Sequence, residues 1–286
     1  FSIADNSNSK LNLEKLTLKG GFVNGNDGAA IIVGRSGDTK LFDCIIEDCE
    51  ALNGGAIAIW ASGTATLTNT DIKNCSAKLF SGNTPPNGSG GAIYAEGGTV
   101  IMTNCTLTGN TAENNGGAVY AKKTSDLTPI LSTVTIEGGS IGGTDAGKAN
   151  NATDSGGSGG GLYIDNNTTL TLKNCTVTGN TAQEKGGSVY VTGNNVQFIM
   201  EGSTTITPAL DKNDVYLDNN NMITVDNTLS PQGGTAARIT PANYSTTTQA
   251  LTGGAASTEH SKFTVTPQST PPKTWSVGSN GYLKTP

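Results

Sequence analysis

The chain has 286 residues, a net charge of −6 at pH 7 and 39 glycines, whereas only 5% of its residues are aromatic and 14% are charged. A helical protein of this size would carry more Leu, Glu, Lys and Ala, so the composition favours short strands joined by tight turns. The acidic balance without a basic run excludes nucleic acid as a partner, and no apolar stretch reaches the roughly 18 residues of a membrane span.

A repeat starts near residue 11 and recurs to about residue 195. Its first half alternates apolar and polar residues, which is typical of a strand with one buried face. Its second half is a Gly-Gly pair, a small residue, an apolar residue and usually Tyr. This second half recurs, in stronger and weaker copies, at residues 28–31, 54–57, 90–94, 116–120, 159–163 and 186–190.

Each unit contains these two strands and a third short strand, with no helical stretch between units. The repeat therefore predicts an all-β fold, a right-handed single-stranded parallel β-helix with three short strands per coil and a β-rich C-terminal cap. In our alignment Val134 and Ile136 follow Cys105 and Leu107 in the first strand, and Ile141 lies in the small-residue column of Ala112.

The regularity weakens after residue 195, and Pro and Thr become frequent near the end. A solenoid needs a terminal cap because its last turn would otherwise expose a sheet edge and the core. We therefore expect a β-helix over residues 1–240, and a degenerate turn with a cap over residues 241–286. A small separate β segment from about residue 240 is the alternative.

The segment Leu107-x-x-Asn110-x-Ala112-x-x-x-Gly116-Gly117-Ala118-Val119 resembles the repeat of chlamydial polymorphic outer membrane proteins. That repeat pairs a Phe-x-x-Asn motif with Gly-Gly-Ala followed by Ile, Leu or Val. The first motif departs here, since Leu107 stands where the family has Phe, and Cys49 and Cys75 replace Asn. The resemblance covers residues 11–195 and implies a β-helix on a bacterial surface, often adhesive and autotransporter-like.

The surface assignment has consequences for partners. The chain starts at Phe1 without Met or a signal-like segment, so we interpret it as a processed portion of a longer protein. We expect an extracellular or bacterial outer-surface location and a monomer. The expected partner is a protein or glycan on a host or neighbouring cell.

The five cysteines are an odd number, and their spacing indicates neither a metal site nor a redox motif. Cys44, Cys105 and Cys175 share an inward column but lie two turns apart, about 9.6 Å, which exceeds the roughly 7 Å limit for a disulfide. We interpret them as small buried hydrophobic residues. Cys49 and Cys75 share a column on adjacent turns, where a disulfide is within reach but strained, and we favour free thiols.

Three carboxylates, Asp43, Glu47 and Asp71, converge on the outward face of the first strands. A carboxylate pair could serve glycoside hydrolysis. Lys19 and Lys73 flank Glu47 on neighbouring turns, however, and such an alternation is typical of a solvated face. We therefore expect no catalytic residue, and a carbohydrate-active enzyme using this trio is the alternative.

A second acidic group, Asp211, Asp214 and Asp218, could chelate Ca²⁺ through its oxygen atoms. Turn formation explains Asp at these positions equally well. We expect no metal and no cofactor, with a calcium site as the alternative.

Insertions concentrate at one corner of the predicted coil, at Lys78–Ser89 and Gly142–Ser158, which bracket Glu113–Asn115. Loops on a rigid scaffold often carry binding residues, and two turns of stacking would separate these loops by about 10 Å. The candidate binding residues are Phe80, Asn83, Asn87, Glu113, Asp145 and Asn150. We predict a non-catalytic segment of a bacterial surface or secreted protein that binds a ligand through these loops. A carbohydrate-active enzyme and a structural spacer are the alternatives.

Overall fold

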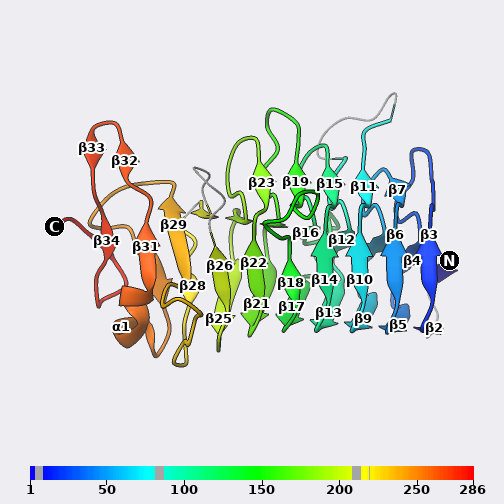
Figure 1. Ribbon diagram of the computed structural model, residues 1–286, viewed down its shortest axis with the longest axis horizontal. Helices are drawn as coiled ribbons and strands as arrows, with labels where there is room; N and C mark the ends of the chain where they lie inside the picture. The colour runs from blue at the N-terminus through cyan, green and yellow to red at the C-terminus, as the bar shows by residue number, and fades with distance from the viewer. Residues whose placement is uncertain (4–8, 81–86, 208–213, 219) are drawn as a thin grey trace.

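The computed structural model describes residues 1–3, 9–80, 87–207, 214–218 and 220–286. Strands from successive repeats stack in register into a rod, with the two chain ends at opposite ends of the stack (Figure 1). A step of 26 residues from Ile45 to Asp71 brings the chain once around the coil, and the next turn, from Asp71 to Thr106, takes 35 residues. The fold is therefore the predicted parallel β-helix.

In the described part of the chain the strands form four long sheets, which the chain visits in the order A, B, C and D on the second to sixth turns. Sheet A comprises β1 (Ser2–Ile3), β4 (Ile31–Val33), β8 (Ile57–Ile59), β12 (Ile93–Glu96), β16 (Val119–Lys122), β20 (Leu162–Ile164), β24 (Val189–Val191), β27 (Val215–Leu217), β29 (Ala237–Pro241), β31 (Phe263–Val265), β34 (Ser276–Val277) and β35 (Leu283–Lys284). Sheet B comprises β2 (Lys10–Glu14), β5 (Asp38–Phe42), β9 (Thr64–Thr68), β13 (Thr99–Thr103), β17 (Ser132–Glu137), β21 (Thr168–Lys173), β25 (Gln197–Glu201), β28 (Ile223–Thr224) and β30 (Leu251–Thr252).

Sheets C and D are narrower and complete the circuit. Sheet C comprises β3 (Thr17–Lys19), β6 (Ile45–Glu47), β10 (Asp71–Lys73), β14 (Thr106–Thr108), β18 (Ser140–Ile141), β22 (Thr176–Thr178) and β26 (Thr205–Thr207). Sheet D comprises β7 (Glu50–Ala51), β11 (Ser76–Ala77), β15 (Thr111–Ala112), β19 (Asn151–Ala152) and β23 (Thr181–Ala182). Sheets A, B and C supply the three predicted strands of each turn, and the two-residue strands of sheet D are an addition.

The fifth turn corrects our alignment. Val134 and Ile136 lie in β17 of sheet B, where they pair with Val100 and Met102. Ile141 takes the place in sheet C beside Leu107. The sequence alignment placed β17 with the strands of sheet C instead of sheet B. Apolar and polar residues alternate with the same period of two in both sheets, so the pattern does not distinguish them.

The interior of the rod is filled by inward-facing aliphatic side chains that stack from turn to turn. In sheet C, for example, Ile46, Ile72 and Leu107 stand in one column, and each is fully buried. Large core side chains of this kind contribute about 1.5–3 kcal/mol each when buried. Hydrophobic burial and the inter-turn hydrogen bonds together hold the stack.

The Gly-Gly pair forms the corner from sheet D into sheet A. Gly116 has φ of 67°, a conformation that an L side chain rarely adopts. A Cβ on Gly117 would lie 2.2 Å from the carbonyl oxygen of Gly160 on the next turn. The pair therefore recurs because this corner needs both a left-handed residue and a close backbone approach.

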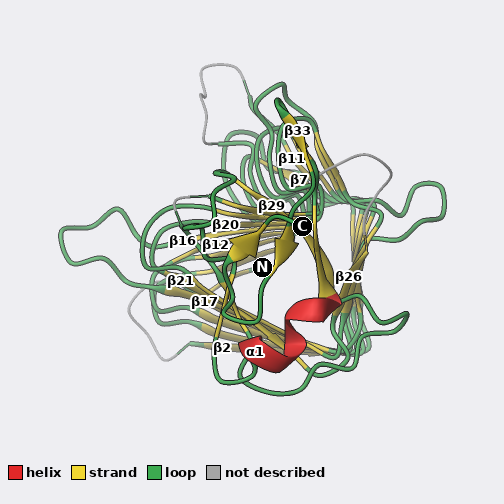
Figure 2. Ribbon diagram, turned by 90° about the vertical axis from the view of Figure 1, so that its left-hand side faces the viewer, coloured by secondary structure: helices red, strands yellow, loops and turns green. Residues whose placement is uncertain are grey.

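Parallel pairing continues past residue 240, since β30 pairs with β28 and β31 pairs with β29. Then β34 and β35 pair antiparallel at the edge of sheet A, and β32 (Gln268–Ser269) forms a small hairpin with β33 (Pro272–Lys273). The short helix α1 (Ala256–Glu259) and a 3₁₀ turn (His260–Lys262) lie at this C-terminal end (Figure 2). In the part of the chain that is described, no helix is long and apolar enough to cross a membrane.

Candidate functional site: a polar groove beside a tyrosine row

A row of aromatic side chains runs along the outer face of sheet A. Tyr94, Tyr120, Tyr163, Tyr190 and Tyr216 pair in strict register on successive strands. Neighbouring ring centroids are 4.9 to 5.4 Å apart, and the first two rings are nearly parallel at 2°. We call these five residues the tyrosine row. Their close stacking leaves little ring surface free.

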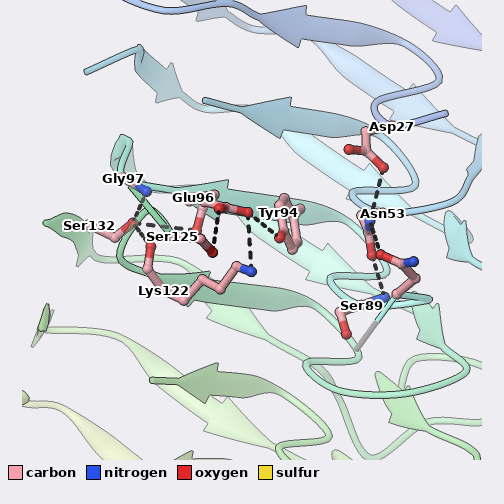
Figure 3. A network of polar contacts seen from close by, with 11 residues as sticks. Asp27, Asn53, Ser89, Tyr94, Glu96, Gly97, Lys122, Ser125 and Ser132 are labelled. Atoms are coloured by element: carbon pink, nitrogen blue, oxygen red, sulfur yellow. Dashed lines mark hydrogen bonds and ion pairs between the residues drawn. The ribbon is translucent and has the colours of Figure 1, made fainter. Parts of the chain in front are cut away.

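A charged side chain follows two residues after four of these five tyrosines, on the same face. The Tyr94 hydroxyl donates a hydrogen bond of 2.7 Å to Glu96, and the Lys122 ammonium lies 3.2 Å from the same carboxylate (Figure 3). Three turns further on, the Tyr190 hydroxyl donates to Asp218 at 3.0 Å. Burial of the rings and these carboxylate neighbours raise the tyrosine pKa values, so the hydroxyls stay protonated donors.

An amide network lies at the opposite end of the sheet A strands, at the corner where the chain enters from sheet D (Figure 3). The Asn53 amide donates to Asp27 at 3.0 Å and to Asn87 at 3.3 Å, and its oxygen accepts from the Ser89 backbone at 3.1 Å. Burial raises the pKa of Asp27, and the Asn53 hydrogen bonds oppose this rise. The network fixes three successive corners to one another.

Four cavities occur in succession along the opposite corner, where the chain passes from sheet A to sheet B. Their volumes are about 230, 360, 350 and 200 Å³ from the fifth turn toward the C-terminal end. We call this line of cavities the A–B groove. Its lining includes the polar residues Lys122, Asp165, Asn166, Asn167, Asn194, Asn195, Gln197, Asp218, Asn220, Asn221, Asn243 and Gln249.

Hydrogen bonds between turns hold part of the A–B groove in place. The Asn166 side chain accepts from the Asn194 backbone at 3.0 Å, and the Asn195 amide donates to Asn167 at 3.1 Å. Asn167 and Asn195 also have positive φ, of 52° and 55°, which Asn tolerates better than most residues. Gln197 and Asn243, by contrast, are exposed in the groove. Their side chains could bind a ligand without breaking the hydrogen bonds that hold this corner.

The carboxylates predicted on sheet C have structural partners. Glu47 lies between Lys19 and Lys73, with both ammonium groups 2.9 Å away. These lysines lower the pKa of Glu47, so it remains ionised and has no proton for acid catalysis. Asp43 accepts a hydrogen bond of 3.1 Å from Asn69 at a corner, and Asp71 is half-buried in β10. The arrangement is a ladder of opposite charges.

The predicted second insertion, Gly142–Ser158, is divided between two corners. Residues 142–150 connect sheet C to sheet D, whereas residues 153–158 follow sheet D, as residues 78–89 do on the third turn. Backbone hydrogen bonds join Gly88 to Asn114 and Glu113 to Asp154 at this second corner. Asn150 corrects our expectation of an exposed binding residue, because it is fully buried and bonded to Asn110 and Asn180.

The remaining predicted binding residues have separate contacts. Phe80 packs edge-on against Phe22 at 6.1 Å, Glu113 accepts a hydrogen bond from the Leu79 backbone at 2.6 Å, and Asn87 belongs to the Asn53 network. Asp145 is exposed and forms an ion pair with Lys148 at 2.8 Å. Asn83 lies outside the described residues.

The predicted metal ligands also have other partners. Asp211 lies outside the described residues. Asp214 is buried and forms an ion pair with Arg238 at 3.0 Å. Burial raises its pKa to about 7 despite this arginine. Asp218 accepts hydrogen bonds from Tyr190 and Thr192. No three His, Cys, Asp or Glu side chains of the described residues gather as metal ligands.

The A–B groove was absent from our sequence-based prediction. A signal for it exists, since Tyr is followed two residues later by Glu96, Lys122, Asp165 and Asp218 in four of the five units, and runs of Asn follow the last two acids. In the sequence, four of the five tyrosines only mark the end of a Gly-Gly segment. The groove depends on which connections lie side by side, and that requires the register of every turn.

Comparisons with known proteins agree with this architecture. A family model described as a right handed beta helix region matches residues 2–205. No curated protein matches the chain, and no solved structure matches it.

Proposed function

Because the chain belongs to the right-handed β-helix family, we propose that it is a non-catalytic binding rod that holds a linear glycan along the A–B groove. The observation that carries this proposal is the succession of four cavities along one corner. A ligand with a repeated unit can contact equivalent groups on successive turns, which lie about 4.8 Å apart. A polymer therefore fits this groove better than a small molecule.

The groove chemistry indicates the class of polymer. Amides and carboxylates such as Asn243, Gln197 and Asp165 accept and donate hydrogen bonds to hydroxyl groups. The net charge of −6 and the acidic groups in the groove disfavour a polyanion. We therefore propose an uncharged glycan, with hydrogen bonding rather than ring stacking as the main source of affinity.

The setting of this activity is also a proposal. The Gly-Gly-Ala repeats resemble those of bacterial surface proteins, and a rigid rod suits display away from a cell. We propose that the chain acts as a monomer in a cell-surface or secreted bacterial protein, and that the glycan belongs to a host or a neighbouring cell. Adhesion through the groove would replace the loop cleft that we predicted.

Glycan binding can be tested with two groove variants. We expect Gln197→Ala and Asn243→Ala each to weaken binding to a neutral polysaccharide by roughly 3- to 10-fold, the effect of one lost hydrogen bond of about 1 kcal/mol. Calorimetric titration against a panel of neutral and uronate polysaccharides measures this. Gln183→Ala, an exposed change at the corner between sheets D and A, is the matched control and should bind as the unchanged chain does.

The same panel separates the alternatives. No binding to any polysaccharide would contradict the proposal and favour a spacer. Shortened or unsaturated products in the incubation would contradict the non-catalytic role and favour a carbohydrate-active enzyme. Equal losses in Gln183→Ala and the two groove variants would remove the groove as the binding site.

A further inference from the structure

The corner between sheets C and D directs the side chains of successive turns at one another. Asn110, Asn150 and Asn180 occupy it on the fourth, fifth and sixth turns and are fully buried. The Asn110 amide nitrogen lies 3.0 Å from the Asn150 side-chain oxygen, and the Asn150 nitrogen lies 2.9 Å from the Asn180 oxygen. Side chains in this column therefore touch from one turn to the next.

Cys49 and Cys75 occupy the same column on the second and third turns. The Cys75 backbone N–H donates to the Asn110 side chain at 3.0 Å, which joins the cysteine to the amide column. The residues that follow, Glu50 and Ser76, pair in register. Adjacent strands lie about 4.8 Å apart, inside the range of about 4.4–6.8 Å between the Cα atoms of disulfides. Both thiols are free in the structure.

A cavity leads to one of the two sulfur atoms. Gly21 takes this corner on the first turn, and a Cβ there would lie 3.4 Å from Cys49 Sγ. Leu18, Lys19, Gly21 and Cys49 line a cavity of about 260 Å³ at the N-terminal end of the rod. Cys49 lines this cavity although only 1% of its surface is exposed, whereas Cys75 is fully buried one turn deeper.

The two thiols differ in acidity. A hydrogen bond from the Cys75 thiol lowers the pKa of Cys49 to about 7, and burial opposes this effect. The same hydrogen bond, together with burial, raises the pKa of Cys75. The thiolate is the nucleophile in thiol–disulfide exchange, so Cys49 reacts first. Once Cys49 is in a mixed disulfide, its negative charge is gone and the main cause of the raised Cys75 pKa disappears.

We propose that Cys49 and Cys75 are a redox pair that reacts with low-molecular-weight disulfides, such as oxidised glutathione, and joins the second and third turns of the rod. The Cys49 thiolate attacks one sulfur of the glutathione disulfide and releases one glutathione. Cys75 then loses its proton to solvent, attacks the Cys49 sulfur and releases the second glutathione. The two cysteines are oxidised, and the glutathione disulfide is reduced to two thiols.

The test uses the folded chain with oxidised glutathione, followed by intact-mass measurement and peptide mapping. We expect the loss of two hydrogen atoms and a linked Cys49–Cys75 peptide. Cys75→Ser should instead retain one glutathione on Cys49, and Cys105→Ser should react as the unchanged chain does. An unchanged mass, or modification spread equally over all five cysteines, would overturn the proposal.

A second measurement uses the unchanged chain, so it does not require a cysteine variant to fold. The rate of Cys49 alkylation by iodoacetamide in the unchanged chain should rise with pH through a midpoint near 7. Cys105 has the same 1% exposure as Cys49 but does not line the cavity. Burial raises its pKa, so it is an internal reference and should react at least 10-fold more slowly at pH 7. Equal alkylation of Cys49 and Cys105 in the folded chain would contradict an accessible reactive thiol.

Discussion

At the residue scale, one corner column shows how a single position is used in different ways along the rod. Asn150 donates to the Leu107 carbonyl and to Asn180, and its own backbone donates to the Asn180 side chain. The amides satisfy backbone groups that the turn would otherwise bury without partners. On the second and third turns cysteine takes the position, and each sulfur atom lies 3.4 Å from a backbone carbonyl oxygen, that of Glu47 for Cys49 and that of Lys73 for Cys75.

We expect Asn150→Ala to destabilise the chain by about 2–4 kcal/mol, because it removes buried hydrogen bonds to the Leu107 carbonyl, to the Asn110 side chain and to the Asn110 backbone N–H. Urea unfolding followed by circular dichroism measures the change. Asn243→Ala, at an exposed position, is the matched control and should change the free energy of unfolding by less than about 0.5 kcal/mol. Equal effects of the two substitutions would show that the amide column is not a source of stability.

At the element scale, the positions at which strands begin and end depend less on the residues of the strands than on the residues at the corners between them. The corner from sheet B to sheet C is made by Asn104 and Asn174 with φ of 52°, and the corner from sheet D to sheet A is made by the Gly-Gly pair. Long connections are tolerated elsewhere, as between β16 and β17, without any change in register. The corners therefore set the coil, and the connections are free to vary.

Gly117→Ala should destabilise the rod by about 3 kcal/mol, because the added methyl group would overlap the Gly160 carbonyl oxygen on the next turn. Thermal unfolding measures the loss as a lower midpoint. Gly156→Ala adds the same methyl group where nothing lies within 4 Å, so its midpoint should match that of the unchanged chain. A normal midpoint for Gly117→Ala would mean that the turns can separate locally at little cost.

The repeat allowed the fold class, the inward columns and the Lys-Glu-Lys ladder on sheet C to be predicted. The placement of the fifth turn could not be predicted. The segment Ser132–Glu137 alternates buried and half-buried residues as the strands of sheet C do, so its pattern does not show to which sheet it belongs. The A–B groove was missed for a related reason. Residues such as Asn166 and Asn194 are 28 positions apart, and only the register shows that their connections touch.

At the scale of the whole molecule, antiparallel strand pairs close the C-terminal end of the rod, whereas the turns before it pair in parallel. The last parallel strand, β31, is covered by antiparallel β34, which pairs in turn with β35. Trp275 packs into the core from this segment and donates to Gln268 at 3.1 Å. A covered edge cannot recruit strands from another molecule.

Removal of residues 267–286 should make the chain associate with itself, because the edge of β31 would be left with unpaired backbone groups. Light scattering after size exclusion measures this as a mass that increases with concentration, and far-ultraviolet circular dichroism checks that the remaining β structure is folded. A shortened chain that stays folded and has the same mass as the full chain at each concentration would contradict a protective role for the cap.

The two ends of the chain lie at opposite ends of the stack (Figure 1), and this placement determines how the rod carries mechanical load. Tension along the axis pulls directly on the hydrogen bonds between turns and acts first on the outermost turn. A turn of 26 residues, such as that between Asp43 and Asn69, would lengthen from about 4.8 Å of stack to about 90 Å of extended chain. Under such a load the coil would therefore extend one turn at a time while the remaining turns keep their shape.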